Sequence, residues 1–419
     1  MPYPGEEYFT LDDFDLRGKT VLLRVDINSP LDPESGRILD DHRIKSHIDT
    51  IRDLGDTRLI IVAHQSRPGK NDYTSLEPHA ERLSQLLRKE VEYVDGLFEK
   101  HALKKIREMR RGDILLLENA RFFAEETYLK GESDWEKHEN THIVKKLSQE
   151  IDFFVHDAFA AAHRAQPTLV GFSSVVPCMA GRVMESELKN MGKAFTMDRS
   201  PKLAFLGGMK ADDSIEVAEH MLSGGKIDKI LTGGVTANIF LMASGHDLGE
   251  GNREFLEDEL PGYEKIVEDA EELLEKWPDR IKLPKDVVLN EEGERNGIPL
   301  DALPSDHPIF DIGLDTIMEY RKEIEDASLV VLNGPAGAFE IDDFSIGTTE
   351  IFKAIAHSNA YSIIGGGHST AVLENLDLED EIDHISTGGG SCINFLAGKK
   401  LSGVKALNRS YREFKKESI

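Results

Sequence analysis

The segment PCMAGRVMESELKNMGKAFTMDRSP, residues 177–201, separates two halves of the chain that carry different chemistry. Four apolar residues in it follow one another at spacings of four, three and four: Met184, Leu188, Met191 and Phe195. This spacing predicts one helix with an apolar stripe, which starts after Gly181 and ends before Pro201. Gly192 interrupts the stripe, where glycine costs roughly 1 kcal/mol relative to alanine. The pattern fits a hinge helix between two lobes, and it equally fits an ordinary core helix with one tolerated glycine.

Short runs rich in valine, isoleucine and leucine recur on both sides of this segment, each followed by a stretch with helical periodicity. They are residues 21–25, 59–63, 114–117 and 153–155 in the first half, and residues 203–206, 229–231, 329–332 and 362–364 in the second. Strands this apolar are buried on both faces, and their alternation with helices predicts parallel sheets. We therefore expect an α/β fold with two doubly wound parallel-sheet, Rossmann-like domains joined by a hinge helix.

The length of the chain, 419 residues, also favours two domains, because one hydrophobic core rarely organises so many residues. We place an N-terminal domain at residues 1–181, the hinge helix at 182–197, a C-terminal domain at 198–391 and a last segment at 392–419. That last segment has little to bury by itself, so we expect it to pack on another part of the protein.

The composition of the chain argues against several classes of function. The formal net charge of −27 argues against non-specific binding to nucleic acid or to anionic membranes. No stretch resembles a membrane span or a signal peptide, so a cytoplasmic location is expected. Cys178 and Cys392 lie far apart without a Cys/His cluster, which predicts two buried core residues. The acidic stretch over residues 256–277 is predicted to be a solvated helical face.

Polar and cationic side chains follow the strands of the first half, where parallel α/β sheets bind their ligands. These residues are Asp26, Asn28, His64, Arg67, Asn119, Arg121, Asp157, His163 and Arg164. Arg43 joins them near the start of DDHRIKSHIDTIRDLG, a predicted helix whose buried face is Ile44, Ile48, Ile51 and Leu54. Several guanidinium groups on one surface predict a ligand with more than one negative charge, although each arginine alone also fits a surface salt bridge.

Glycine-rich loops follow the strands of the second half instead. They are GGMK (207–210), TGG (232–234), NGPAGAFE (333–340), GGGHS (365–369) and STGGGS (386–391). Glycine turns that run into helices allow backbone N–H groups to approach phosphate oxygens. We expect helices to start near Asp213, Thr236, Ser369 and Thr370. Neither GxxxxGK[ST] nor GxGxxG occurs, which weighs against a P-loop NTPase and an ordinary Rossmann dehydrogenase.

These motifs, in this order, resemble the phosphoglycerate kinase family nearly from end to end. The motifs RVDINSP (24–30), AHQSRP (63–68), LLENARF (116–122), DAFAAAHRAQPT (157–168) and GGMKADDSI (207–215) resemble the family's RVDFNVP, SHLGRP, LLENLRF, DAFGTAHRAHAS and GGAKVSDKI. NGPAGAFE, GGGHS and STGGGSCINFLAGKKLSGVKAL continue the resemblance through the second half.

The resemblance implies an ATP-dependent phosphotransferase of glycolysis and gluconeogenesis. Such an enzyme transfers a phosphoryl group reversibly between ATP and the carboxylate of 3-phosphoglycerate, giving ADP and 1,3-bisphosphoglycerate, by hinge closure and in-line transfer. It implies that the last segment returns to the N-terminal domain. Its partners are these nucleotides and phosphoglycerates, with Mg²⁺ bound together with ATP or ADP.

The resemblance also implies roles for individual residues. Phosphoglycerate would be held by Asp26, Asn28, Arg43, His64, Arg67, Arg121 and Arg164. The nucleotide would be held by Gly207, Lys210, Gly233, Gly234, Asn333, Pro335, Glu340, Gly366, Gly367, His368 and Ser369. Arg43, Lys210, Gly367 and Gly390 would serve catalysis, and the loop over residues 387–390 would donate to phosphates.

Two positions depart from the family pattern. The aspartate of the family's GGGD is His368 here, and the second lysine of GGAKVSDK is Ser214. Because Mg²⁺ prefers oxygen ligands, no protein ligand is certain and Asp213 is the candidate. The departures keep open a catalytically silent relative that binds nucleotide or phosphoglycerate. A dehydrogenase with a divergent cofactor loop is a third hypothesis.

Overall fold

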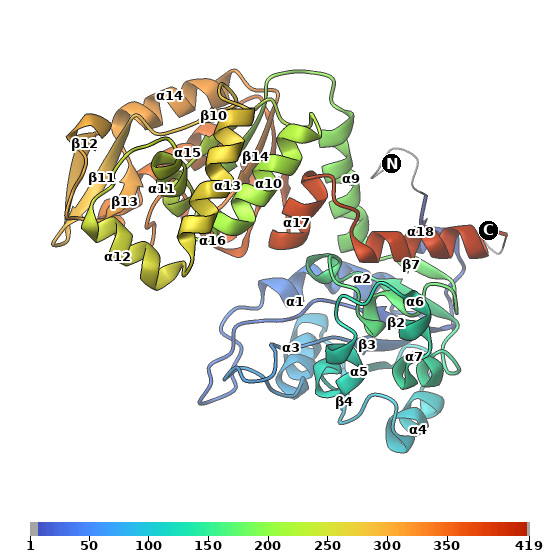
Figure 1. Ribbon diagram of the computed structural model, residues 1–419. Coiled ribbons are helices and arrows are strands. Elements are labelled where there is room, and N and C mark those ends of the chain that lie inside the picture. Colours follow the sequence, from blue (N-terminus) through green and yellow to red (C-terminus); the bar gives the residue numbers. More distant parts are fainter. Residues whose placement is uncertain (1–6, 417–419) are drawn as a thin grey trace. The chain divides into compact units, whose positions relative to one another are not determined.

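The chain divides into two compact units. The computed structural model describes residues 7–416, except for the side chains of Phe195 and His368. One unit comprises the chain up to Gly192 together with the segment from Lys400 onward, and the other is Lys193–Lys399. The first division therefore falls inside helix α9 (Arg182–Thr196), so this one helix contributes residues to both units (Figure 1).

A seven-stranded parallel sheet forms the first unit, in the order β1-β7-β6-β2-β3-β5-β4. Its strands are β1 (Phe9–Thr10), β2 (Thr20–Arg24), β3 (Arg58–Val62), β4 (Glu92–Val94), β5 (Ile114–Leu117), β6 (Phe153–His156) and β7 (Cys178–Ala180). Adjacent residues of β2 enter different cores: Leu23 packs with Ile44, and Leu22 packs with Ile106. Both faces of the sheet are therefore buried. The strand order reverses between β2 and β6, where such sheets bind ligands.

Short helices and the C-terminal helix surround this sheet. They are α1 (His42–Ser46), α2 (Ile48–Asp53), α3 (Glu77–Leu87), α4 (Lys100–Glu108), α5 (Ala124–Tyr128), α6 (Trp135–Glu139), α7 (His142–Leu147), α8 (Pro167–Val170) and α18 (Ser402–Phe414), with 3₁₀ turns η1 (Leu11–Asp13), η2 (Ala120–Phe122) and η3 (Phe159–Ala161). Helix α18 packs along β7, where the Cys178 N–H donates to Ser410 Oγ at 2.8 Å (Figure 1). Its Tyr411 ring lies 4.8 Å from the ring of Phe9, between centroids.

The second unit combines two sheets. A parallel sheet has the order β10-β9-β8-β14-β15-β16, and an antiparallel sheet has the order β12-β11-β13. The strands are β8 (Lys202–Leu206), β9 (Lys229–Thr232), β10 (Ile281–Lys282), β11 (Asp286–Glu291), β12 (Glu294–Pro299), β13 (Ile309–Ile312), β14 (Leu329–Asn333), β15 (Tyr361–Gly365) and β16 (His384–Ile385). The order of the parallel sheet reverses between β8 and β14.

Eight helices accompany these sheets in the described part of the unit. They are α10 (Ala211–Ser223), α11 (Gly234–Ala243), α12 (Glu250–Glu259), α13 (Tyr263–Lys276), α14 (Leu314–Glu325), α15 (Ile346–Ala356), α16 (Gly367–Leu376) and α17 (Gly389–Leu396), with 3₁₀ turns η4 (Leu300–Ala302), η5 (Asp342–Phe344) and η6 (Glu379–Glu381). Between residues 7 and 416, no helix combines the length and the apolar character needed to cross a membrane.

The expected α/β class with doubly wound parallel sheets is confirmed, and each predicted strand lies within one residue of an observed one. Met184, Leu188 and Met191 are fully buried on α9, as the apolar stripe predicts. The side chain of Phe195 lies outside the described residues. Cys178 and Cys392 are buried and unbonded to each other, also as predicted.

Several predicted helix boundaries are wrong. The helix predicted to start after Gly181 does begin at Arg182, but residues 178–180 before it form strand β7, which was not predicted and pairs with β6 and β1. The helix predicted over residues 40–55 is broken into α1 and α2 at His47, although its four predicted core residues are all buried. The acidic stretch is two helices, separated where Gly262 adopts a left-handed φ of 83°.

The predicted helix starts are also wrong, because glycines or Lys210 supply the capping backbone earlier. Helix α16 starts after Gly366, which has a φ of 101° that glycine adopts readily. Helices α11 and α10 start after Gly233 and Lys210. Thr236, Asp213, Ser369 and Thr370 therefore lie inside their helices rather than at the caps.

Candidate active site

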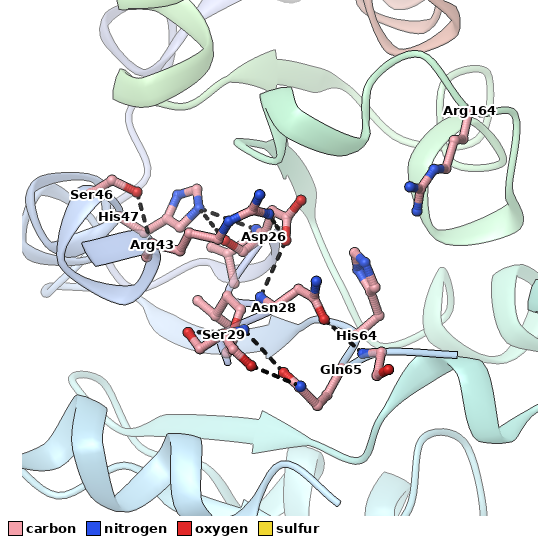
Figure 2. Close-up of polar contacts among 12 residues, drawn as sticks. Asp26, Asn28, Ser29, Arg43, Ser46, His47, His64, Gln65 and Arg164 are labelled. Carbon is pink, nitrogen blue, oxygen red and sulfur yellow. Dashed lines mark hydrogen bonds and ion pairs between the residues drawn. The ribbon is translucent and has the colours of Figure 1, made fainter. Parts of the chain in front are cut away.

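Asp26 lies at the centre of a polar cluster in the first unit, where the chain leaves β2 (Figure 2). Its side chain is buried, and Oδ1 accepts the N–H of Asn28 at 3.2 Å. Arg43 Nη1 approaches the same oxygen at 3.3 Å. Burial alone would raise the pKa of Asp26, but the charges around it, including those of Arg43 and Arg24, hold the pKa below its usual value. Asp26 is therefore an ionised carboxylate facing cations.

Asn28 joins the loops after β2 and β3, since its Oδ1 accepts the Ser66 N–H at 2.7 Å. Ser66 also binds the next loop, because Arg121 donates to its carbonyl oxygen. His64, in the loop after β3, is also buried, and its Nδ1 lies 2.9 Å from Arg24 Nη2. Burial and the neighbouring arginines lower the pKa of His64, so its imidazole is neutral near pH 7. The residues after three adjacent strands thus form one surface.

Arginines outnumber carboxylates on this surface. Burial lowers the pKa of Arg164, and the nearby charges of Arg43 and Arg67 lower it further against the opposing effect of Asp26. The pKa of Arg121 is lowered to about 10, first by burial and then by Arg164. Figure 2 shows Arg164 directed toward Asp26 and His64. Such mutual repulsion is relieved when a multiply charged anion binds.

The seven residues expected to hold phosphoglycerate therefore all lie in the first unit, around this surface. Three further buried residues support it and were not singled out from the sequence: Arg24, His47 and Gln65. Gln65 bridges two loops, accepting the Ser29 N–H at 3.1 Å and donating to the Ser29 carbonyl at 2.9 Å. A polar residue in the apolar stripe of residues 44–51 was the available signal for His47.

The glycine loops after β8, β9 and β14 pack backbone against backbone at the reversal of the second sheet. Gly207 N–H donates to Asn333 O at 2.9 Å, and Gly208 N–H donates to Pro335 O at 2.8 Å. Gly234 N–H donates to Ala336 O at 2.7 Å. Glycine is required at Gly207 and Gly234, because an added Cβ would collide with Pro335 O at the first position and come within 2.7 Å of Gly208 N at the second. Their N–H groups are therefore used within the protein, contrary to the expectation that they face phosphates.

The starts of α16 and α17 differ from those loops. A Cβ on Gly367 or Gly390 would meet nothing within 4 Å. The first N–H groups of a helix have no partner inside the helix, so both starts are suited to accept an anion. Ser369 Oγ is buried and has no hydrogen-bond partner among the described residues. His368 lies in the same helical turn, but its side chain is outside the described part of the chain.

Lys210 and Glu340 are exposed in the second unit, whereas Pro335 is buried and Asn333 is half-buried. Lys210 caps α10, so it precedes Asp213 by one turn. The pKa of Asp213 is raised by desolvation and by the charges of Asp212 and Glu216, which Lys210 opposes. In the described part of the chain, no group of three His, Cys, Asp or Glu side chains is arranged to hold a metal ion.

Asp311 supports the loop over residues 333–340 from β13. Its carboxylate accepts the Gly347 N–H at 2.8 Å and the Ile312 N–H at 2.9 Å. Burial raises its pKa to about 7, because these bonds and Arg295 Nη2, 3.8 Å away, compensate only in part. A Cβ on Gly337 would come within 2.5 Å of Asp311 Oδ1. The carboxylate therefore sets the separation between this loop and α15.

The raised pKa of Asp311 predicts how the free energy of unfolding depends on pH. The folded protein holds this proton more tightly than the unfolded chain, whose carboxyl keeps its ordinary pKa of 3.8. Its contribution is therefore full below about pH 4 and is lost as the pH rises through about 7. Between about pH 5 and 8, the unfolding free energy of Asp311→Asn should gain on that of the wild type by on the order of 2 kcal/mol, measured by urea denaturation. The exposed Asp301→Asn is the control, and a pH-independent difference for Asp311→Asn would contradict the assignment.

A cationic surface after parallel strands in one unit, and open glycine-capped helices in the other, define the class of α/β proteins that act on phosphorylated ligands. The family described as Phosphoglycerate kinase matches residues 11–399. The chain belongs to the phosphoglycerate kinase family, and the expectation of an ATP-dependent phosphotransferase is confirmed at this level.

Individual relatives cover nearly the whole chain. A phosphoglycerate kinase of Methanosarcina mazei is 49% identical over 98% of this chain and 97% of its own. That of Thermoplasma acidophilum is 47% identical over 98% and 99%. The crystal structure of phosphoglycerate kinase from Pyrococcus horikoshii has a TM-score of 0.89 and 43% identity, and it covers 97% of this chain and 100% of its own. The similarity therefore includes both units.

Proposed function

We propose that this chain transfers a phosphoryl group reversibly between ATP and the carboxylate of 3-phosphoglycerate, giving ADP and 1,3-bisphosphoglycerate. The observation that carries the proposal is the gathering of Arg43, Arg67, Arg121 and Arg164 on one surface of a chain with a formal net charge of −27. Such a surface matches a ligand with both a carboxylate and a phosphate. Asp26, Asn28 and His64 would hold the protein loops of this surface in position and contact the hydroxyl group of this ligand.

The second unit would hold the nucleotide. The N–H groups at the starts of α16 and α17, including those of Gly367 and Gly390, would donate to its phosphates together with Lys210. Asn333 and Glu340 would contact the nucleoside. Gly207, Gly233 and Gly234 would shape this site through loop packing rather than by donating to it, because their N–H groups are occupied.

Little covalent help from the protein is needed in this reaction. The acceptor carboxylate is already a nucleophile, so no general base is required. Arg43 and Lys210 would neutralise charge on the equatorial oxygens of the transferred group. Since these residues belong to different units, transfer requires the units to approach each other, and we propose α9 as the hinge helix. Closure would exclude water as a competing acceptor.

Mg²⁺ is the metal that we propose to accompany the nucleotide. Asp213 is an oxygen donor one turn after Lys210, and its pKa is raised first by desolvation and then by the negative charges of Asp212 and Glu216. One carboxylate plus phosphate oxygens and water is an arrangement that Mg²⁺ commonly adopts. When bound, the ion would neutralise charge on the phosphates.

The position of His368 leads to a metal-specific prediction. His368→Asp restores an oxygen donor at the start of α16, and oxygen is the donor that Mg²⁺ prefers over nitrogen. We expect transfer to remain measurable and the Mg²⁺ concentration for half-maximal rate to fall by about threefold or more, with a smaller change for Mn²⁺. His357→Asp, at the C-terminal end of α15, is the control. An unchanged metal dependence in His368→Asp would count against this role.

The activity itself is tested by ADP formation from ATP with purified protein, with and without 3-phosphoglycerate. Turnover that requires the acid supports the kinase. Tight binding of both ligands without turnover would support the catalytically silent relative, which the comparisons do not favour. Operation in gluconeogenesis follows from the reversibility of the transfer and is part of the proposal. The cytoplasmic location stays a prediction.

A further inference from the structure

His47 lies at an interruption between two short helices of the first unit. Helix α1 carries Arg43 and ends one residue before His47, and α2 begins one residue after it. The residue His47 is 2% exposed and shares the buried face of Ile44 and Ile51. Both ring nitrogens have partners. Nδ1 lies 2.7 Å from Asp157 Oδ2. Nε2 lies 3.1 Å from the Asp26 backbone nitrogen and 3.2 Å from the Asp26 carbonyl oxygen (Figure 2). A polar group in this position is stable only because both contacts are made.

Asp157 extends this connection to α9. It follows β6 and is completely buried. Its second oxygen, Oδ1, accepts the N–H groups of Val183 at 2.9 Å and Met184 at 3.2 Å, in the first turn of α9. A Cβ on Gly181 would collide with the same oxygen, so glycine is needed for this approach. Asp157 thus binds His47 with one oxygen and the start of α9 with the other.

Helix α2 holds the same turn of α9 through a second set of bonds. Thr50 Oγ1 accepts the Arg182 N–H at 3.0 Å, and the Arg182 guanidinium donates to Asp53 Oδ2 at 2.7 Å. Any displacement of α1 or α2 about His47 therefore reaches the first turn of α9 by two routes. The last residues of α9, from Lys193 onward, belong to the second unit.

We propose that the buried His47–Asp157 pair couples phosphoglycerate binding to the hinge helix α9. The inference rests on the proposed function, because it places phosphoglycerate against Arg43 and Asp26. An anion that binds Arg43 competes with its ion pair to Asp26 and repels that carboxylate. The resulting shift of Asp26 and α1 moves His47, and Asp157 transmits the shift to the N–H groups of Val183 and Met184 in the first turn of α9. His47 and Asp157 are positioning residues and do not touch the substrate.

The direction of the hydrogen bonds provides a way to perturb this path without making a cavity. The Asp157 carboxylate accepts from Nδ1–H, which leaves Nε2 to accept the Asp26 N–H. In Asp157→Asn the side-chain amide can donate to Nδ1. The ring then carries its proton on Nε2, which donates to the Asp26 carbonyl oxygen instead of accepting the Asp26 N–H, so the contact with Asp26 changes direction. The variant keeps an oxygen for the Val183 and Met184 N–H groups, so the fold of α9 is preserved.

The experiment measures the coupling between the two ligands in the full chain. Isothermal titration gives the dissociation constant of 3-phosphoglycerate with and without a non-hydrolysable ATP analogue, and the ratio is the coupling factor. For the wild type we expect a factor of about 5 or more. For His47→Ala and Asp157→Asn we expect the factor to approach 1, while the dissociation constant of 3-phosphoglycerate alone stays within about threefold. The turnover number should fall with the factor, and KM should change little.

A matched control separates coupling from general destabilisation. His138 is also completely buried and bonded, to Glu132 O at 3.0 Å, but it lies in α6, and its ring bonds no residue of α9 in the described part of the chain. His138→Ala should lower the melting temperature and leave the coupling factor unchanged. If His47→Ala does not fold, Asp157→Asn carries the test.

The outcomes are distinguishable. Weaker 3-phosphoglycerate binding with an unchanged coupling factor in both variants would assign His47 a local structural role and overturn the proposal. An uncoupled wild type would also overturn it, while leaving the kinase activity intact. A wild type that binds no 3-phosphoglycerate would overturn the proposed function, and this inference with it.

Discussion

Replacing Arg43 with alanine is expected to lower the turnover number by about 10²- to 10³-fold, the usual effect of removing one group that stabilises developing charge. Arg43 lies on α1 and pairs with Asp26 at 3.3 Å, with its side chain 38% exposed. It is therefore accessible to a ligand while its position is set by a buried carboxylate. If Arg43 acts on the transferred group, the turnover number falls more than the affinity for 3-phosphoglycerate.

Arg52→Ala is the control for this measurement. Arg52 lies on α2, is exposed and pairs with Asp49 at 3.5 Å in a surface contact. Its loss should leave the turnover number within about twofold, because exposed ion pairs contribute little. Steady-state kinetics in both reaction directions compare the turnover numbers of the two variants. Equal losses in the two arginine variants would show that overall charge, rather than the placement of Arg43, controls the rate.

Replacing Gly334 with alanine should strongly weaken nucleotide binding. Gly334 follows β14, has a φ of 84° and lies where the loops after β8 and β14 meet. A Cβ there would collide with the carbonyl oxygen of Gly207 and approach Gly208 N at 3.0 Å. The left-handed backbone costs alanine about 1–2 kcal/mol, and the collision separates the loops in addition. Nucleotide affinity should fall by about 100-fold or more, because several loop contacts are lost together.

Gly293→Ala isolates the contribution of the backbone conformation. Gly293 lies between β11 and β12 of the same unit, with a φ of 101°, and a Cβ added there would meet nothing within 4 Å. The variant incurs the left-handed strain without a collision, so it should be slightly less stable and bind nucleotide normally. Calorimetry of ligand binding and of unfolding compares the two variants. Phosphoglycerate binding should survive in both, since these glycines belong to the second unit. Normal nucleotide binding by Gly334→Ala would refute the role of loop packing.

Apolar runs in the sequence were sufficient to predict the α/β class and eight strands of the two parallel sheets, but not the antiparallel sheet β12-β11-β13. The eight predicted strands are apolar runs whose two faces are both buried, so their positions follow from composition over three to five residues. Boundaries were less predictable. Residues 178–180 form a strand only because β6 and β1 offer partners from distant parts of the chain. The residues around positions 178–180 do not indicate which strands will pair with them.

The arginine surface was predictable because parallel strands bring their carboxyl ends to one edge, so residues after different strands become neighbours. The roles of the glycines were not. Gly207 and Gly390 both occur in glycine-rich loops, yet one donates its N–H to Asn333 and the other lies at an open helix start. Whether an N–H group is free depends on the loop packed against it, which sequence motifs do not specify.

The sequence by itself determined the α/β class, the two contrasting groups of loops after the strands and membership of the phosphoglycerate kinase family, since these depend on patterns local in the chain or ordered along it. Only the tertiary structure showed that His47 interrupts a helix and joins Asp26 to Asp157, and that Asp157 binds the first turn of α9. The physical reason is that a buried polar side chain takes whichever partners the fold brings within hydrogen-bonding distance. Those partners lie 21 and 110 residues away along the chain, beyond the reach of any local pattern.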